Sequence, residues 1–129
     1  MSFAKEQEEL CNLSAVQMRY LYKIYQISLS KPEVLSADIA RKLKVSKPSV
    51  AKMLSVLSEK KLILKKRYGK ISITDSGKLI ADEYEQRIKM LASLIPKMGL
   101  VLTDEEITAG AFALADALPE SVWEMKRRQ

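Results

Sequence analysis

The residues best suited to chemistry are basic and hydroxylic side chains gathered between Ser36 and Lys60. Lysine ammonium groups bind phosphate oxygens and guanine edges, and serine hydroxyls hydrogen-bond to either. The side chains expected to face outward from the second half of this stretch are Lys47, Ser49, Lys52 and Ser55. Two interpretations follow: a face that binds nucleic acid, or the ordinary solvated face of an amphipathic helix pair.

Two helices joined by a tight turn would position these side chains. Ser36 is expected to cap the first helix, with Asp38 in its first turn, where the helix dipole favours negative charge. Ser46 is expected to cap the second helix, and Pro48 is tolerated there because first-turn N–H groups lack intrahelical partners. Apolar residues at helical spacing predict the buried sides: Ile39, Ala40 and Leu43, then Val50, Met53, Leu54 and Leu57. This is the pattern of a helix-turn-helix whose second helix enters a major groove.

The distribution of charge favours the nucleic-acid interpretation. The chain has 129 residues and a formal net charge of +6. Between Arg41 and Lys70 there are eleven basic residues and one acid, Glu59, whereas the rest of the chain has eleven basic and fifteen acidic residues. Such a block is typical of a phosphate-binding face, since each neutralised phosphate releases counterions. A membrane surface would also attract it, but the block lacks the Trp or Phe of a membrane-binding helix.

The segment from Leu62 to Thr74 predicts a β-hairpin. Ile71 and Ile73 alternate with polar residues, the period of a half-buried strand, and Gly69 supplies the positive φ of a tight turn. The tip carries Lys66, Arg67, Tyr68 and Lys70. A basic hairpin directly after a recognition helix is typical of a wing that approaches a phosphate backbone or minor groove. A plain surface hairpin would not explain why the tip is basic.

The N-terminal segment predicts an arm, a helix and a loop. Residues 2–12 are a charged arm, and Ser14 is expected to cap a helix that ends near Ser28. Three tyrosines of this helix indicate core or interface packing, with base stacking as the alternative: Tyr20, Tyr22 and Tyr25. Residues 28–35 contain Pro32 and are predicted to be a loop.

Three helices are predicted after the hairpin. Thr74 is expected to cap a helix over residues 75–95, which Pro96 ends. Thr103 and Glu106 form the capping box of a helix that runs to about residue 118, rich in small residues that permit close packing. A short helix after Pro119 adds three apolar side chains: Val122, Trp123 and Met125. This apolar surface exceeds what a small winged-helix core can cover, and it predicts a homodimer.

Composition excludes several classes of protein. The chain has no histidine, which removes the commonest general base and metal ligand, and its single cysteine, Cys11, rules out an internal disulfide framework. No apolar run is long enough to span a bilayer, and the N-terminus is polar rather than signal-like. These features predict a cytoplasmic protein. An enzyme is disfavoured because the sequence shows no recognised catalytic arrangement.

Three stretches resemble the metal-dependent repressors of the diphtheria toxin repressor and manganese transport regulator type: LYKIYQIS, SADIARKLKVSKPSVAKMLSVLSEKKLI and ITDSGKLIADEYEQR. The resemblance spans roughly residues 14–122 and is to the short form without a further C-terminal domain. It implies a mostly α fold with a small β wing. A winged helix-turn-helix domain would occupy residues 1–74, followed by a helical dimerisation domain over residues 75–129.

The resemblance also implies where the family holds its activating metal. The groups come from the first helix, the long helix and the following helix, and the corresponding positions here are Arg19, Tyr22, Ile88, Phe112, Ala115 and Asp116. Only Asp116 is a suitable ligand, whereas divalent metals need several oxygen, nitrogen or thiolate donors. We therefore expect no metal and no other cofactor. Apolar side chains would replace the ion, or the gap would hold an organic effector with Arg19 available to pair an anionic group.

Together these features predict a homodimeric, sequence-specific transcriptional regulator, a repressor that binds a palindromic site in double-stranded DNA without metal. The candidate DNA-binding residues are Ser36, Ser46, Lys47, Pro48, Ser49, Lys52, Lys66, Arg67, Tyr68 and Lys70. In the family, the first turns of the recognition helix enter the major groove, at positions 46–49 and 52 here. One alternative is a winged-helix module whose basic face binds an acidic protein, and another is a regulator that responds to a small organic effector.

Overall fold

The computed structural model describes residues 13–127, with the backbone alone for residues 124–127. The predicted arm at residues 2–12, with Cys11, lies outside the described residues, as does the side chain of Met125. The chain divides into two compact units, residues 1–82 and 83–129. Its elements are α2 (Ala15–Ser28), β1 (Val34–Leu35), α3 (Ser36–Leu43), α4 (Lys47–Glu59), β2 (Ile63–Lys65), β3 (Lys70–Ile73), α5 (Asp75–Leu94), α6 (Asp104–Ala117) and α7 (Glu120–Arg127).

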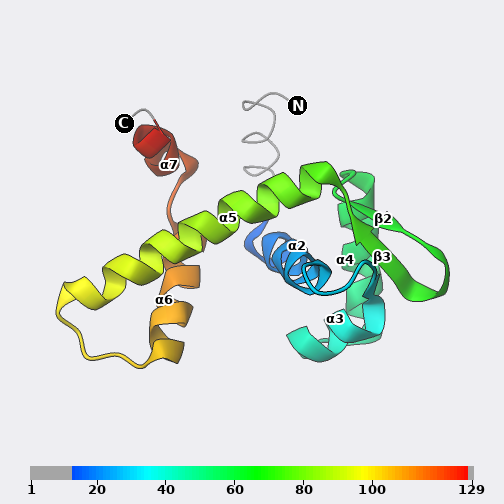
Figure 1. Cartoon of the computed structure of the whole chain (residues 1–129), viewed down its shortest axis with the longest axis horizontal. Coiled ribbons are helices and arrows are strands. Elements are labelled where there is room, and N and C mark those ends of the chain that lie inside the picture. Colours follow the sequence, from blue (N-terminus) through cyan, green and yellow to red (C-terminus); the bar gives the residue numbers. More distant parts are fainter. Residues whose placement is uncertain (1–12, 128–129) are drawn as a thin grey trace. The chain divides into compact units, whose positions relative to one another are not determined.

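The fold class is confirmed: helices predominate, and a small antiparallel sheet accompanies α2, α3 and α4 (Figure 1). Ser14 caps α2 through a capping box with Gln17, and its hydroxyl accepts a hydrogen bond from the Gln17 N–H at 3.1 Å. Tyr20 and Tyr22 are buried, which confirms the packing interpretation for these two rings. The core of the first unit consists of fully buried aliphatic side chains: Leu21, Ile24, Val34, Ile39, Val50, Leu57, Leu62, Ile63, Ile71 and Ile80.

The predicted cap at Ser36 is wrong. Ser36 is the first residue of α3, and the cap position is Leu35, which makes no side-chain hydrogen bond. Leu35 is held there because it pairs with Lys70 in the sheet, so the strand sets where the helix begins. The predicted cap at Ser46 is confirmed, and Pro48 occupies the first turn of α4. Met53 is half-buried, whereas the rest of its predicted stripe is buried.

The sheet has a strand that the sequence pattern did not predict. Its order is β1-β3-β2, with all neighbours antiparallel, and Val34 of β1 pairs with Ile71 of the hairpin. In the hairpin, Ile63 pairs with Ile73 and Lys65 with Ile71. β1 has two residues, too few to show alternation, and it lies in the segment that we expected to be a loop. It fastens the wing to the start of α3.

Thr74 joins α5 to the winged helix. Its hydroxyl accepts a hydrogen bond from the Gly77 N–H at 3.1 Å and lies 2.9 Å from the Lys61 carbonyl oxygen, while its own N–H donates to the Leu62 carbonyl at 3.0 Å. Gly77 lies so close to Leu62 that a Cβ at position 77 would be 2.2 Å from the same carbonyl oxygen. The residue type at 77 is therefore fixed by the packing of α5 against the chain that leads into β2.

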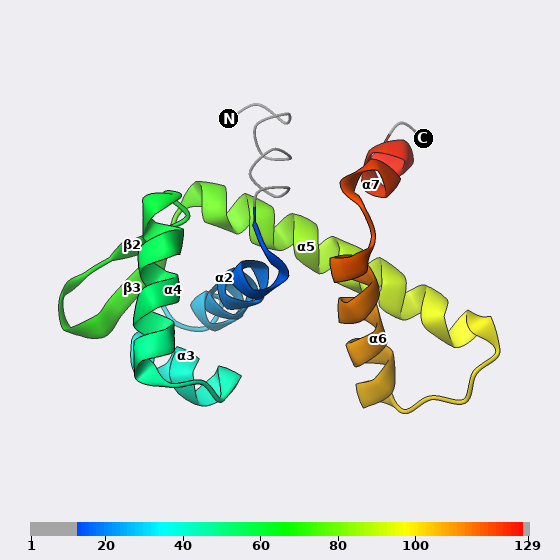
Figure 2. The ribbon, with the colours of Figure 1, turned by 180° about the vertical axis from the view of Figure 1, so that it is seen from behind.

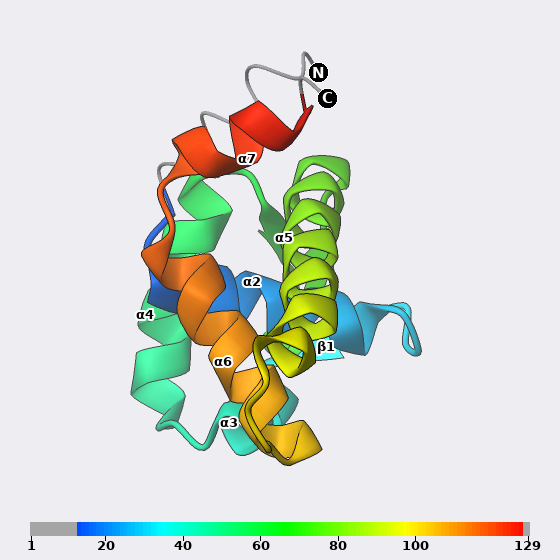
Figure 3. The ribbon, with the colours of Figure 1, turned by 90° about the vertical axis from the view of Figure 1, so that its left-hand side faces the viewer.

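The second unit is built from the C-terminal part of α5 together with α6 and α7 (Figure 3). The predicted capping box of α6 is confirmed, and the hydrogen bond from the Thr103 N–H to the Glu106 carboxylate, at 2.9 Å, lowers the pKa of Glu106. α5 ends at Leu94, and Pro96 lies in the short 3₁₀ turn that follows. None of the helices in the described part of the chain is long and apolar enough to cross a membrane.

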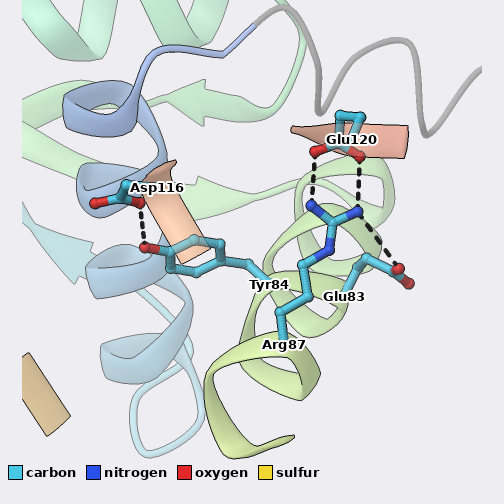
Figure 4. A network of polar contacts seen from close by, with 5 residues as sticks. All are labelled: Glu83, Tyr84, Arg87, Asp116 and Glu120. Atoms are coloured by element: carbon cyan, nitrogen blue, oxygen red, sulfur yellow. Dashed lines mark hydrogen bonds and ion pairs between the residues drawn. The ribbon is translucent and has the colours of Figure 1, made fainter. Parts of the chain in front are cut away.

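A buried ion pair fastens α7 to α5 (Figure 4). Arg87 is 5% exposed, and its two terminal nitrogens donate to the Glu120 carboxylate at 2.6 and 2.8 Å. Glu83 lies 3.8 Å away on the same helix. The guanidinium also lies 4.9 Å from the ring centroid of Trp123, which is 4% exposed. Neither Arg87 Nε nor Trp123 Nε1 has a hydrogen-bond partner among the described residues.

Candidate nucleic-acid interface

The N-terminal half of α4 presents a set of exposed polar side chains. The Ser46 hydroxyl accepts from the Ser49 N–H at 3.2 Å and lies 2.8 Å from the Ser49 hydroxyl, which orders the first turn. Lys47, Pro48, Ser49 and Lys52 are all exposed, so these side chains are accessible to a base edge or a phosphate.

Ser55 does not belong to this outward set, contrary to expectation. It is half-buried, and its hydroxyl donates to the Ala51 carbonyl at 3.1 Å. The same hydroxyl accepts a hydrogen bond from Lys65 Nζ at 3.2 Å. Lys65 therefore reaches from β2 onto the face of α4. Sequence reasoning counted it only within the basic block, because no local pattern indicates that the two side chains meet.

The tip of the wing is exposed and basic. Lys66, Arg67, Tyr68 and Lys70 are all exposed, and the Lys66 N–H donates to the Lys70 carbonyl at 2.8 Å. Tyr68 and Gly69 both have positive φ, 63° and 70°, as the primed hairpin turns require. The predicted role of Gly69 is confirmed. Lys66 Nζ lies 3.9 Å from a Glu33 carboxylate oxygen, so its charge is partly offset.

The start of α3 lies against the wing. A Cβ on Gly69 would lie 2.9 Å from the Ser36 hydroxyl, which places Ser36 beside the turn rather than at a cap. Of the ten candidate residues, all except Ser36 are exposed, and all come from three neighbouring elements of the first unit (Figure 2). The structure thus brings together α4, the helix before it and the wing.

A buried carboxylate in α3 pairs with two basic side chains. Asp38 is buried and accepts a hydrogen bond from Arg41 Nη2 at 2.7 Å, with Lys31 Nζ at 3.6 Å. Burial raises the pKa of Asp38, but the hydrogen bond from Arg41 and the two positive charges outweigh it and lower the pKa below its usual value. The carboxylate stabilises the fold above its unfolded-state pKa, and this contribution is lost as the pH falls through the lowered value.

The positions that the resemblance assigns to a metal lie in both units. In the first unit Arg19 is exposed and Tyr22 is buried. In the second unit Ile88 and Ala115 are buried, Phe112 lies with its ring centroid 6.0 Å from that of Tyr84, and Asp116 accepts a hydrogen bond from the Tyr84 hydroxyl at 3.0 Å. Within residues 13–127 there is no group of three or more His, Cys, Asp or Glu side chains placed to hold a metal ion.

Comparison with known proteins matches part of the first unit to a protein family. Residues 12–71 match the family described as "Iron dependent repressor, N-terminal DNA binding domain". No similar sequence is found among the curated proteins.

Several solved structures have a similar fold. The manganese regulator SloR is 25% identical with a TM-score of 0.67, and ScaR, solved with bound Zn²⁺, is 27% identical with a TM-score of 0.65. The alignments cover 81% and 84% of this chain but 48% and 50% of those proteins, so the chain spans about half their length. ZitR from Lactococcus lactis is 26% identical with a TM-score of 0.57, and the alignment covers 88% of this chain and 74% of ZitR.

The matched residues include every element that carries the candidate residues, except the last strand residues of the wing, and the resemblance drawn from the sequence is confirmed. Over residues 12–71, the chain is therefore similar to the N-terminal DNA-binding domain of the iron-dependent repressors.

Proposed function

We propose that this protein is a homodimeric repressor that reads a palindromic DNA site through α4 and grips the backbone with its wing. The observation that carries the proposal is the exposed set at the start of α4, Lys47, Pro48, Ser49 and Lys52, beside an exposed basic wing in a matched DNA-binding domain. Lysine recognises guanine O6 and N7, and the proline ring can contact a thymine methyl group.

We further propose that DNA binding does not depend on a divalent metal. The support lies in the donor chemistry: of the six positions implied by the family, only Asp116 carries a carboxylate, and the chain has no histidine. Ile88 and Ala115 are buried apolar side chains, and Arg19 is a cation where a cation would have to bind. These residues do not fit a metal site.

The homodimer is proposed from the second unit. Several large apolar side chains are exposed there, and exposed apolar patches usually mark surfaces that contact another protein. They are Leu94, Met98, Leu100, Val101, Leu114 and Val122. Trp123, which the sequence suggested as part of this surface, is instead buried within the unit. A two-fold dimer would place two recognition helices about one DNA turn apart, or a multiple of it.

Selection of bound sequences from a random duplex pool tests the whole proposal. The chelator-treated protein should select a palindrome, and adding manganese, iron, cobalt or zinc should change neither the selected sequence nor the affinity. A single half-site would contradict the dimer, and metal-restored binding would contradict metal independence. No selection and no salt-sensitive binding to duplex DNA would favour the alternative, a module that binds an acidic protein.

Substitutions in α4 and in the wing should have different effects. Lys47→Ala and Lys52→Ala should relax sequence preference, by about 1–3 kcal/mol for each base edge that is no longer read. Arg67→Ala and Lys70→Ala should weaken binding to all duplexes alike. They should also make the slope of log K against log[salt] less steep by about 0.9 for each phosphate that is no longer neutralised. Binding of each variant to the selected site and to random duplex, at several salt concentrations, measures both effects. If all four variants lose only general affinity, α4 is not the reading element.

Replacing Tyr68 with glycine should have opposite effects on stability and on DNA binding. The ring is 89% exposed, and its backbone φ of 63° disfavours a bulky side chain by roughly 1–2 kcal/mol. Tyr68→Gly should therefore raise the thermal stability while lowering DNA affinity, because the ring that would contact the sugar–phosphate backbone is removed. Tyr68→Ala is the matched control, since it removes the ring but keeps the strain. A Tyr68→Gly variant with unchanged DNA affinity would mean that the ring does not touch DNA.

A further inference from the structure

A groove with a volume of about 360 Å³ opens between α3, α4 and the wing. Its size is within the range of small-molecule sites, roughly 300–1,000 Å³. At the ~30 Å³ that one water occupies in the liquid, it has room for about a dozen non-hydrogen atoms.

The floor of the groove is apolar. Val50 and Leu54 from α4 and Ile71 from β3 belong to the buried core, and they line the groove together with Ala51. None of these side chains can hydrogen-bond to water or to a phosphate. A purely polar occupant, such as an inorganic anion, would leave this floor wetted, so the floor favours an occupant with an apolar body.

The rim of the groove is cationic. Four of its lining residues are lysines and none is acidic: Lys47, Lys65, Lys66 and Lys70. Lys65 and Lys66 already contact Ser55 and Glu33, but Lys47 and Lys70 have no ion-pair partner among the residues described. The start of α3 adds polar donors, because its cap residue, Leu35, supplies no side-chain acceptor to the first-turn N–H groups.

We propose that this groove binds a small organic acid of about a dozen non-hydrogen atoms: a single carboxylate on an apolar body. The carboxylate lies at the rim, between Lys47, Lys70 and the Ser36 hydroxyl, and the body covers the floor. The binding itself does not rest on the proposed function. Its consequence does, because Lys47, Lys66 and Lys70 belong also to the nucleic-acid interface, so acid and DNA exclude each other.

Decanoate and 2-naphthoate are suitable probes, one with a flexible and one with a flat apolar body. A titration followed by backbone amide NMR should show saturable shifts at Ser36, Ala51 and Gly69, with a Kd on the order of 0.1–1 mM for a ligand of this size. The acid that binds more tightly indicates whether the apolar body of the natural ligand is flexible or flat. Decanol, which lacks the charge, should bind at least tenfold more weakly.

Two variants separate the groove from general apolar binding. Ala51→Leu fills the groove without loss of helix propensity and should abolish the shifts. Ala113→Leu, the same change at an exposed position of α6, should leave them intact. The proposal is overturned if neither acid saturates these amides, if Ala51→Leu binds as well as the parent, or if decanol binds equally.

The effect of the acid on DNA binding is measured separately. Saturating decanoate should reduce the affinity for duplex DNA at least fivefold in the parent and not in Ala51→Leu, provided that the variant still binds DNA without decanoate. If acid and DNA bind together without competition, the proposal that they share the lysines of the rim is wrong. If the protein binds the acids but no DNA under any condition, the proposed function fails while the groove assignment stands.

Discussion

Gly77→Ala is expected to destabilise the protein by roughly 3 kcal/mol or more, although alanine is the better helix former by about 1 kcal/mol. The new Cβ would lie 2.2 Å from the Leu62 carbonyl oxygen and 2.8 Å from Ile73 Cγ1. The carbonyl cannot yield cheaply, because it accepts a hydrogen bond from the Thr74 N–H at 3.0 Å. Urea denaturation followed by far-UV circular dichroism measures the loss.

The matched control is the other glycine inside a helix, Gly110 of α6. A Cβ there would lie 3.3 Å from Ile95 Cδ1, the mobile end of a flexible side chain. Gly110→Ala should therefore be neutral or stabilising by up to about 1 kcal/mol, because the gain in helix propensity exceeds the cost of a small shift. Equal stability changes in the two variants would show that the proximity of Leu62 does not restrict position 77.

Glu120→Ala is expected to cost about 3 kcal/mol. It removes both short hydrogen bonds to Arg87 and leaves a nearly fully buried guanidinium with Glu83, at 3.8 Å, as its remaining carboxylate in the network. Breaking a buried ion pair from one side typically costs 3–5 kcal/mol, and the partial exposure of Glu120 places this case at the lower end. The free energy of unfolding in urea again gives the measurement.

Two comparisons isolate the buried charge as the cause. The double variant Arg87→Met with Glu120→Leu removes both charges and should lie within about 1 kcal/mol of the parent, since apolar pairs often replace buried ion pairs without loss. Lys89→Gln, which breaks a 3.9 Å pair on the surface of the same helix, should cost at most about 0.5 kcal/mol. A double variant as unstable as Glu120→Ala would refute this explanation.

Local chemistry made much of the fold predictable. The caps at Ser14, Ser46, Thr74 and Thr103 mark the starts of four helices, and each depends on a side chain and an N–H group two or three residues away. The apolar residues of α5 at three- and four-residue spacing are all buried: Ile80, Tyr84, Ile88 and Leu91. The exposed residues of α4 and the wing follow from the same short-range periodicity.

What the sequence did not reveal depends on contacts between distant residues. β1 exists because Val34 meets Ile71, and this pairing moves the start of α3 and displaces Ser36 from its expected cap. Arg87 and Glu120 are thirty-three residues apart, and nothing in the local charge pattern connects them. The groove likewise combines two helices and the wing, so no single segment carries its signature.

The burial of Trp123 under Arg87 gives the protein an optical probe of its own. It is the single tryptophan in the chain, and light that excites tryptophan but not tyrosine addresses the second unit alone. Its emission should shift to longer wavelength whenever α7 leaves α5 and the indole meets water. Four of the five tyrosines lie in the first unit, at positions 20, 22, 25 and 68. Fluorescence from the unmodified protein can therefore report separately on α7 and on the winged helix.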